Sequence, residues 1–276
     1  MAVVAIVAGA TTAFFNDTET STGNTFTAGA IDLGIDNTSY YNGVFNDETS
    51  WHLTYDMNEN DEGGHLFFDF DDLKPGDWGE DTISLHVKNN DSWLCADVTL
   101  TSNDDNSSTE PELETGDAED EDSDFWDGEL AQHLKWYWWA DDGDNVYEEH
   151  ESLIHSAVSF PDSDEPKTFT VALADSDTNI WGDEGPVNAC DGENDEDCSD
   201  DIRYIAKAWC FGDSDFQPYA EDTTGPDVRP VRCDGSGEGN ETQTDGMTMD
   251  VSFYAEQSRN NDGFVCGDRE LDVLPN

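Results

Sequence analysis

The sequence has few basic residues, and this scarcity argues against partners that are bound through positive charge. Its 276 residues hold 10 Lys and Arg against 66 Asp and Glu, for a net charge of -56. With no basic patch to neutralise phosphates, the composition argues against nucleic acid as a partner. Such a charge repels itself in dilute salt, whereas in molar salt the Debye length falls to ~3 Å. The acidity therefore predicts a surface adapted to high salt; the alternative is a polyanion that binds cations or mineral.

Recognisable catalytic motifs are also missing. The sequence contains no GxSxG, no GxGxxG and no Walker loop. His150 and His155 in "HESLIH" are five residues apart, so on a helix they lie ~140° apart and on a strand they point to opposite faces. They cannot form the zinc pair of a metalloprotease, which needs histidines at i and i+4. Because carboxylates occur everywhere, no glycosidase pair can be singled out. We therefore expect no enzyme, with an exported hydrolase as an alternative.

Aromatic residues are abundant, although apolar residues make up only 35% of the chain. An aromatic content of 11%, with nine Trp, can fill a core and argues against disorder. Short alternating runs recur, as in "TISLHVK", where Ile83, Leu85 and Val87 share one face. "HLFFDF" and "HLKWYWW" are further strand candidates, and "LKPGDW" predicts a turn in which Gly76 can take a positive φ. The pattern predicts an all-β protein, a jelly-roll β-sandwich.

The sandwich is expected to be one domain with acidic insertions and an extended N-terminal arm. Residues 1–23 form the predicted arm and residues 24–276 the predicted domain. Acidic, turn-rich insertions are expected near residues 103–129, 175–201 and 211–246.

Six cysteines in an acidic, exported type of protein predict disulfides rather than a zinc site. The candidates are Cys95, Cys190, Cys198, Cys210, Cys233 and Cys266. Spacing favours Cys190 with Cys198 and Cys210 with Cys233, which leaves the remaining two to join distant strands. Six cysteines allow ~15 pairings, so spacing alone leaves the others open.

Five Asn-x-Ser/Thr sequons permit glycosylation at the surface of an exported protein. In a chain rich in Asn and Thr, some of them arise by chance. They lie at Asn16, Asn37, Asn90, Asn106 and Asn240.

The run "ADDGDNVYEE" is the best metal candidate in the sequence. Asp141, Asp142, Asp144 and Glu148 offer hard oxygen ligands within one turn, and Gly143 permits the bend. Calcium prefers such ligands, although the spacing differs from that of an EF-hand loop. The alternative is an ordinary solvated turn. Apart from calcium, no cofactor is expected.

One motif near the start of the chain resembles a known family. "AFFNDTETSTGNTFTAGAIDLGID" resembles the pattern A-F-F-x-D-T-E-T-x-x-G-N-T-F-x-A-G-x-x-D-L of the TasA/camelysin family, which is exported through a SipW-type signal peptidase. The matching positions are Ala13–Phe15, Asp17–Thr20, Gly23–Phe26, Ala28–Gly29 and Asp32–Leu33. "LKPGDWGEDTISLHVKNNDSWLC" and "DVSFYAEQSRNNDGFVC" are similar to salt-adapted members.

The resemblance implies a subunit of extracellular filaments, such as biofilm matrix fibres or archaeal bundling pili. Such subunits polymerise head to tail when the N-terminal strand of one copy completes the sheet of the next. The implied partners are copies of this chain, outside the cell and not spanning a membrane. The metalloprotease label of camelysin does not carry over, because the zinc motif is absent from this sequence. A monomeric secreted calcium-binding module is the alternative to a filament.

The apolar stretch Ala2–Ala13 fits the part of a donor strand. It is shorter than the ~20 apolar residues of a membrane anchor. Its length and the "TTA" before Phe14 are typical of an export signal, yet no basic residues precede it. We expect it to stay on the chain and fill a neighbour's groove; the alternative is a donor that begins at Phe14. The predicted interface residues are Val3, Val4, Ile6, Val7, Phe14 and Phe15.

Overall fold

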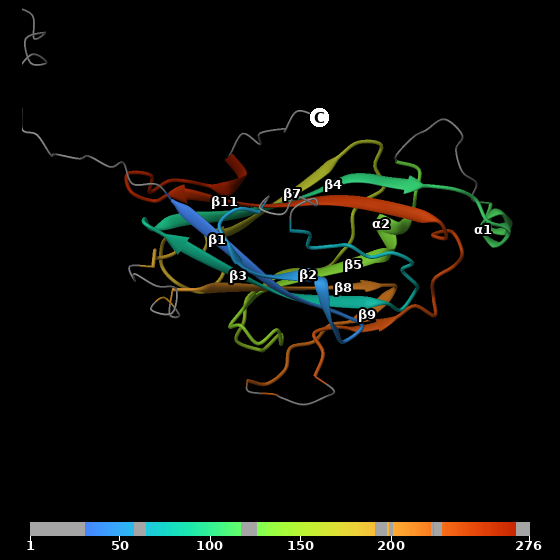
Figure 1. Cartoon of the computed structure of the whole chain (residues 1–276), viewed down its shortest axis with the longest axis horizontal. Coiled ribbons are helices and arrows are strands. Elements are labelled where there is room, and N and C mark those ends of the chain that lie inside the picture. The colour runs from blue at the N-terminus through green and yellow to red at the C-terminus, as the bar shows by residue number, and fades with distance from the viewer. Residues whose placement is uncertain are drawn as a thin grey trace, which may run out of the picture.

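A computed structural model describes residues 31–57, 65–116, 126–190, 198, 201–221, 223 and 228–268. These residues form a nearly all-β molecule with two layers of strands (Figure 1). The predicted N-terminal arm and its six interface residues lie outside the described residues.

The bounds of the elements follow the chain order. The first strands are β1 (Asp32–Tyr41), β2 (Val44–Thr54), β3 (Trp78–Lys88), β4 (Ser92–Asp105), β5 (Leu134–Asp141) and β6 (Leu153–Val158). The remaining strands are β7 (Lys167–Ala174), β8 (Arg203–Phe211), β9 (Asp213–Asp215), β10 (Arg232–Asp234) and β11 (Asp245–Gln257). The helices are α1 (Glu110–Thr115), α2 (Leu130–His133) and a 3-10 turn at Cys266–Asp268.

Nine of the described strands form two facing antiparallel sheets of unequal size, and β9 pairs with β10 in a separate two-stranded sheet. The larger sheet has the order β2-β1-β3-β8-β5-β6, and the smaller has the order β11-β4-β7. Ile83, Leu85 and Val87 of β3 are at most 1% exposed, as their alternation predicts. Leu94 and Ala96 of β4 belong to the same core cluster. The predicted all-β sandwich is confirmed, whereas its jelly-roll connectivity stays a prediction.

Strand β5 is buried on both faces. Trp138 belongs to the core between the sheets, whereas Tyr137 and Trp139 belong to a second apolar cluster on the other face. Phe216, which follows the β9 strand, stacks on Tyr137 with 4.3 Å between ring centroids. This second apolar cluster explains why "HLKWYWW" carries aromatic residues on both faces of the strand.

The predicted strand "HLFFDF", residues 65–70, is wrong. The segment has no strand assignment and pairs with none of the described strands. Phe68 packs edge-on against Trp136 at 5.0 Å between centroids, and Phe70 packs against Trp209 at 5.2 Å. Ring burial therefore determines the path of this segment, in place of backbone pairing.

Three disulfides link the six cysteines in the arrangement that spacing favours. Cys95 of β4 bonds Cys266, Cys210 of β8 bonds Cys233 of β10, and Cys190 bonds Cys198. The first closes a sequence separation of 171 residues, so it fixes the end of the described chain to the smaller sheet.

The sequon at Asn37 is not an accessible glycosylation site in the folded domain. Its side chain is 1% exposed and donates to the Thr49 carbonyl at 2.7 Å and to Asp81 Oδ1 at 3.1 Å. The sequon does not reveal this burial, because it does not show that Asn37 lies on the inward face of β1. Asn106 and Asn240 are exposed and Asn90 is half-buried, so these three stay candidates. Asn16 lies outside the described residues.

Candidate functional site

Strand β11 has an open edge. It pairs with β4 over its whole length, and among the described strands β4 is its only neighbour. An unpaired edge presents backbone N–H and C=O groups that another strand can bond. Its inward side chains are only half-buried: Met247, Met249, Val251, Phe253 and Ala255. Strand β11 is therefore an edge whose inner face is incompletely covered.

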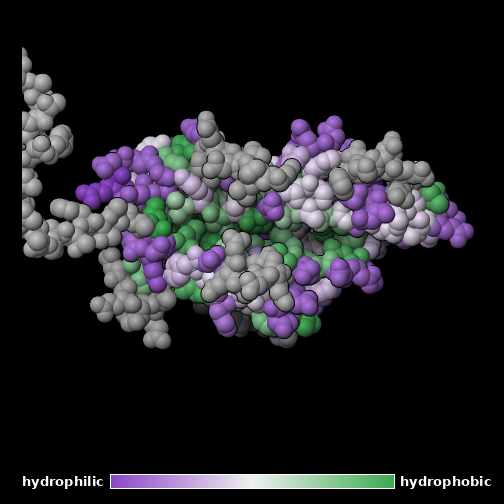
Figure 2. Space-filling model, turned by 45° about the horizontal axis from the view of Figure 1, so that its top comes forward, coloured by the Kyte–Doolittle hydropathy of each residue, from purple (hydrophilic) through white to green (hydrophobic). Residues whose placement is uncertain are grey.

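A groove of about 1230 Å³ runs beside the first part of β11. We call it the β11 groove; it is bordered by residues 245–249, 66–75 and 235–244. Its floor consists of Leu130, Leu134, Trp136, Trp209 and Phe211. Figure 2 shows hydrophobic residues in a band along the middle of one face, with hydrophilic residues on both sides. The groove exceeds the ~300–1,000 Å³ of a small-molecule pocket and suits an extended peptide.

Two tryptophans form the centre of the floor. Trp136 of β5 and Trp209 of β8 are opposite each other in register and are 8% and 1% exposed. Gly79 of β3 lies beneath the second indole, and a Cβ at Gly79 would approach Trp209 Nε1 to 2.4 Å. The glycine therefore makes room for the ring that forms the floor. The alternation in "HLKWYWW" predicted a strand here, but it did not predict a groove.

The short helix α2 is fixed at the groove by side chains from the smaller sheet. Asp245 Oδ2 accepts hydrogen bonds from the Glu129 and Leu130 backbone N–H groups at 2.6 and 2.8 Å. Asn103 Oδ1 accepts from the Ala131 N–H at 3.0 Å. These bonds satisfy the free donors at the helix start and place Leu130 in the floor.

The segment opposite β11 ends in the predicted turn. Gly76 has a φ of +94°, which favours glycine. Asp77 Oδ2 accepts from the Tyr41 hydroxyl at 2.6 Å and from the Lys74 N–H at 2.8 Å. Burial and the Asp77 carboxylate raise the pKa of Tyr41. A Cβ at Gly235 would come within 2.1 Å of the Pro75 carbonyl carbon, so the turn and the 235–244 loop are in direct contact.

The margins of the groove are acidic, in contrast to its floor. Asp69, Asp71 and Asp72 line one side, and Glu238 and Asp245 line the other. These margins favour an occupant that carries no negative charge of its own.

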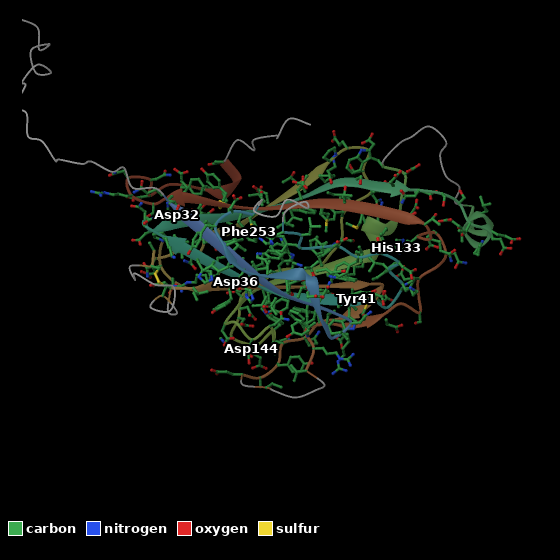
Figure 3. All side chains as sticks on the ribbon, viewed as in Figure 1. Asp32, Asp36, Tyr41, His133, Asp144 and Phe253 are labelled. Carbon is green, nitrogen blue, oxygen red and sulfur yellow. A yellow bond between two sulfur atoms is a disulfide. The ribbon has the colours of Figure 1, made fainter. Side chains whose placement is uncertain are left out.

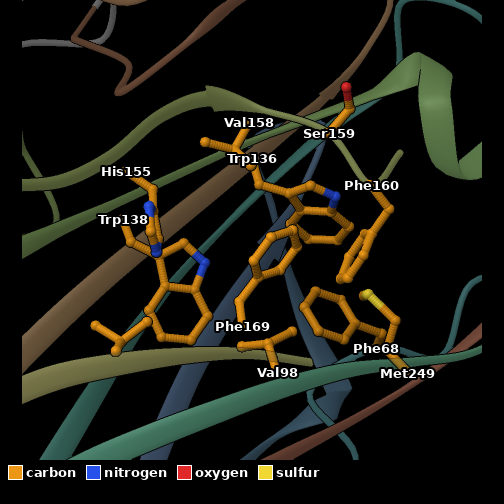
Figure 4. Close-up of a pocket in the computed structure, with 11 residues that line it drawn as sticks. Phe68, Val98, Trp136, Trp138, His155, Val158, Ser159, Phe160, Phe169 and Met249 are labelled. Carbon is orange, nitrogen blue, oxygen red and sulfur yellow. The ribbon is translucent and has the colours of Figure 1, made fainter. Parts of the chain in front are cut away.

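A small apolar pocket lies behind the groove and shares three of its side chains. Figure 4 shows Phe68, Trp136 and Met249 together with residues of β6 and β7 around this pocket of about 30 Å³. His155 lines its other end, where the buried Nε2 has no hydrogen-bond partner. Burial lowers the pKa of His155, so the ring is neutral near pH 7.

The predicted metal turn forms on the far side of the larger sheet, where Figure 3 labels Asp144. Asp141 and Asp142 come together with Glu151, which sequence reasoning missed; the ligand atoms of the three lie within 4.8 Å of one another. Asp142 also gathers with Glu148 and His150, whereas Asp144 belongs to neither group. The connection between β5 and β6 folds back on itself, so Glu151, ten positions after Asp141, joins the turn.

The carboxylates of this turn hold protons more strongly than usual. Burial raises the pKa of Asp141 to about 6, although N–H groups of Asn145 and Gly143 oppose the shift. Burial, together with the charges of neighbouring carboxylates, raises the pKa of Glu151 to about 8. Glu151 accepts from the Asp142 and Glu148 N–H groups at 3.1 and 2.9 Å. The turn can offer oxygen ligands to a hard cation such as calcium.

The two histidines of "HESLIH" take different surroundings. His150 is exposed beside Glu148, with Nδ1 at 3.9 Å from Oε2, whereas His155 faces Trp138 across the β5–β6 pair. Across the described part of the chain, none of the three groups of possible metal ligands contains two histidines.

The fold and the groove define a disulfide-linked β-sandwich whose smaller sheet ends in the edge strand β11 beside an apolar groove. The family model described as camelysin metallo-endopeptidase matches residues 1–47, so the start of the chain is similar to that family. The resemblance predicted from the opening motif is thus confirmed over this N-terminal segment. No curated protein matches the chain. In the described part of the chain, no helix has the length and apolar character needed to cross a membrane.

Proposed function

We propose that this protein is a structural subunit of an extracellular filament. In this filament, the N-terminal arm of one copy lies in the β11 groove of the next. The open edge of β11 beside an apolar groove is the observation that carries the proposal. The match of the first residues to an exported family supports secretion. The acidic composition supports a filament that is stable in high salt.

The arm and the groove have complementary properties. Residues 2–13 contain no charged side chain in a chain of net charge -56, so the arm avoids repulsion from the acidic margins. Extended, these twelve residues span ~40 Å, close to the length of the 13-residue β11. Val4 and Ile6 lie two apart and share one face of a strand, which suits an apolar floor.

Strand addition also explains how a filament grows. Donor and acceptor are different surfaces of one chain, so each bound copy leaves a free groove or a free arm. Backbone hydrogen bonds to the open edge supply affinity, and side chains in the groove supply specificity.

Deletion of residues 2–13 tests the proposal in molar salt. We expect a folded monomer and no fibres by electron microscopy, while the full chain gives fibres with an axial repeat of one subunit. A synthetic peptide of residues 2–13 should bind the truncated protein and not the fibre. Fibres from the truncated protein would rule out this arm as the donor. If Phe14→Asp with Phe15→Asp then abolishes them, the donor begins at Phe14.

The name metallo-endopeptidase belongs to the similar family, and we infer a structural role for this chain. The separate surroundings of His150 and His155 support this inference. Protease assays with casein and zinc test it, since zinc-dependent cleavage by the folded protein that is lost in a Glu151→Gln, His150→Ala variant would contradict it.

Calcium binding by the 141–151 turn is a second candidate function. The gathering of Asp141, Asp142 and Glu151 within 4.8 Å favours it. Calcium should raise the melting temperature of the protein, and Glu151→Gln should remove most of this gain. An unchanged melting curve in calcium and in EDTA would dismiss this candidate.

A further inference from the structure

Three polar side chains meet inside the sandwich on adjacent strands of the larger sheet. Lys207 of β8 is directly opposite Asp81 of β3, and its Nζ donates to Asp81 Oδ2. Asn37 of β1 donates from Nδ2 to Asp81 Oδ1 at 3.1 Å. The exposed fractions are 0% for Lys207 and 1% for each of the other two. A lysine amine and a carboxyl group are thus in contact away from water, with an amide donor on the second carboxyl oxygen.

The surroundings of the pair are aromatic. Lys207 Nζ lies 3.9 Å from the centroid of the Phe68 ring and 5.8 Å from that of Phe67. Trp138 is opposite Lys207 on β5. Two buried charges carry a large desolvation cost, which their attraction offsets only in part. Burial lowers the pKa of Lys207, although Asp81 opposes the shift, so the neutral amine becomes more accessible.

We propose that Lys207 and Asp81 condense to an intramolecular amide bond that links β8 to β3. The ammonium first gives a proton to Asp81 Oδ2, which leaves a neutral amine and a carboxylic acid. The amine lone pair then forms a bond to Asp81 Cγ, and a second proton passes from Nζ to Oδ2. The Cγ–Oδ2 bond breaks and one water leaves, so the ion pair becomes a neutral amide without an oxidant or cofactor.

Asn37 takes part in this reaction by stabilising the other carboxyl oxygen. Oδ1 gains negative charge when the amine attacks and becomes the carbonyl oxygen of the amide. A hydrogen bond from Asn37 Nδ2 to Oδ1 is therefore stronger in the tetrahedral intermediate than in the ion pair. Contact inside a rigid sheet supplies the high effective concentration that amide formation needs.

The bond would close a covalent loop between residues 126 positions apart, in the middle of the larger sheet. The three disulfides join other parts of the molecule, so β3 and β8 would gain a direct link that reducing agents cannot break. This inference concerns the folded monomer and does not depend on filament formation.

Peptide mass spectrometry of the folded, full-length protein tests the proposal. After reduction, alkylation and trypsin digestion, we expect one species that joins the peptides containing Asp81 and Lys207, lighter than their sum by one water. Trypsin should not cleave after Lys207. Two separate peptides of full mass, with cleavage after Lys207, would overturn the proposal. Fragmentation of the joined species should place the link at Asp81 and Lys207, since loss of water at an Asp-Gly pair elsewhere, such as Asp142–Gly143, gives no joined peptide.

Two variants and a folding control make the assignment specific. Lys207→Arg keeps the positive charge but has no amine to acylate, so the joined species should vanish while any loss of water at Asp-Gly persists. Asn37→Ala should slow formation of the bond about 10²-fold after refolding. If a variant does not fold, wild-type protein that was isolated unfolded and kept in denaturant before it could fold serves instead. Its peptides should stay separate until refolding; a link formed without folding would overturn the mechanism.

Discussion

Strands β8 and β11 lie in the same sandwich but differ in their neighbours. Strand β8 pairs with β3 on one side and β5 on the other, and its inward residues Ile205, Lys207 and Trp209 are at most 1% exposed. Strand β11 pairs only with β4 among the described strands, and its inward residues stay half-buried. Strand β8 is thus a central strand with partners on both sides, whereas β11 is an edge strand to which another strand could be added.

This difference separates stability from assembly. Removing apolar atoms from β8 should cost the monomer its stability, because these side chains are already buried before another copy binds. Changes on β11 should affect mainly the contact with another copy. The predictions below test this separation, from the largest expected effect to the smallest.

Trp209→Ala should destabilise the monomer by about 3–5 kcal/mol, because it removes a fully buried indole and leaves a cavity. Urea unfolding in molar salt measures the loss. Phe253→Ala on β11 is the matched control, and its half-buried ring should cost clearly less. Equal losses for the two variants would show that β11 is as well covered as β8.

Met249→Asp should abolish fibres and leave a folded monomer. The new carboxylate lies in the β11 groove, and burying it unpaired under a donor strand should cost about 2–5 kcal/mol, or ~30-fold or more in affinity. Sedimentation and electron microscopy measure assembly. Ser252→Asp places the same charge on the exposed face of β11 and should keep the fibres. Normal fibres from Met249→Asp would argue against the groove as the acceptor.

A substitution in the acidic turn at residues 141–151 should have a smaller effect than those above. It should change how stability depends on pH and leave assembly unchanged. The pKa of Glu151 rises from 4.5 unfolded to about 8 folded, so the folded state binds more protons between these values. Stability from this group is therefore present at low pH and is lost as pH rises through about 8. Glu151→Gln should flatten this decline in melting temperature, with fibres unchanged. If the melting temperature of Glu151→Gln declined with pH as steeply as that of the wild type, other groups would be the cause of the decline.

Local patterns in the sequence predicted much of the sandwich. The alternation of Ile83, Leu85 and Val87 predicted the inner face of β3, because side chains on a strand alternate strictly. Spacing also favoured the disulfide pairs, since Cys190 and Cys198 lie close along the chain. Both signals depend on neighbours in sequence.

Contacts between distant segments could not be predicted in this way. The β11 groove brings residues 66–75 beside residues 245–249, and no local pattern encodes this proximity. The burial of Asn37 and the contact between Asp81 and Lys207 also depend on distant segments, so the sequence did not predict them. The predicted metal ligands did not include Glu151, because the chain turns back on itself between the motif and this residue.

Hydrogen exchange of β11 and β8, measured in the monomer and in the fibre, tests the central claim most directly. In the monomer, the amides on the open edge of β11 should exchange fast, while those of β8 are protected. On assembly the β11 amides should become protected, with β8 unchanged, because a donor strand then bonds that edge. Fibres in which the open edge of β11 still exchanges as fast as in the monomer would contradict the account.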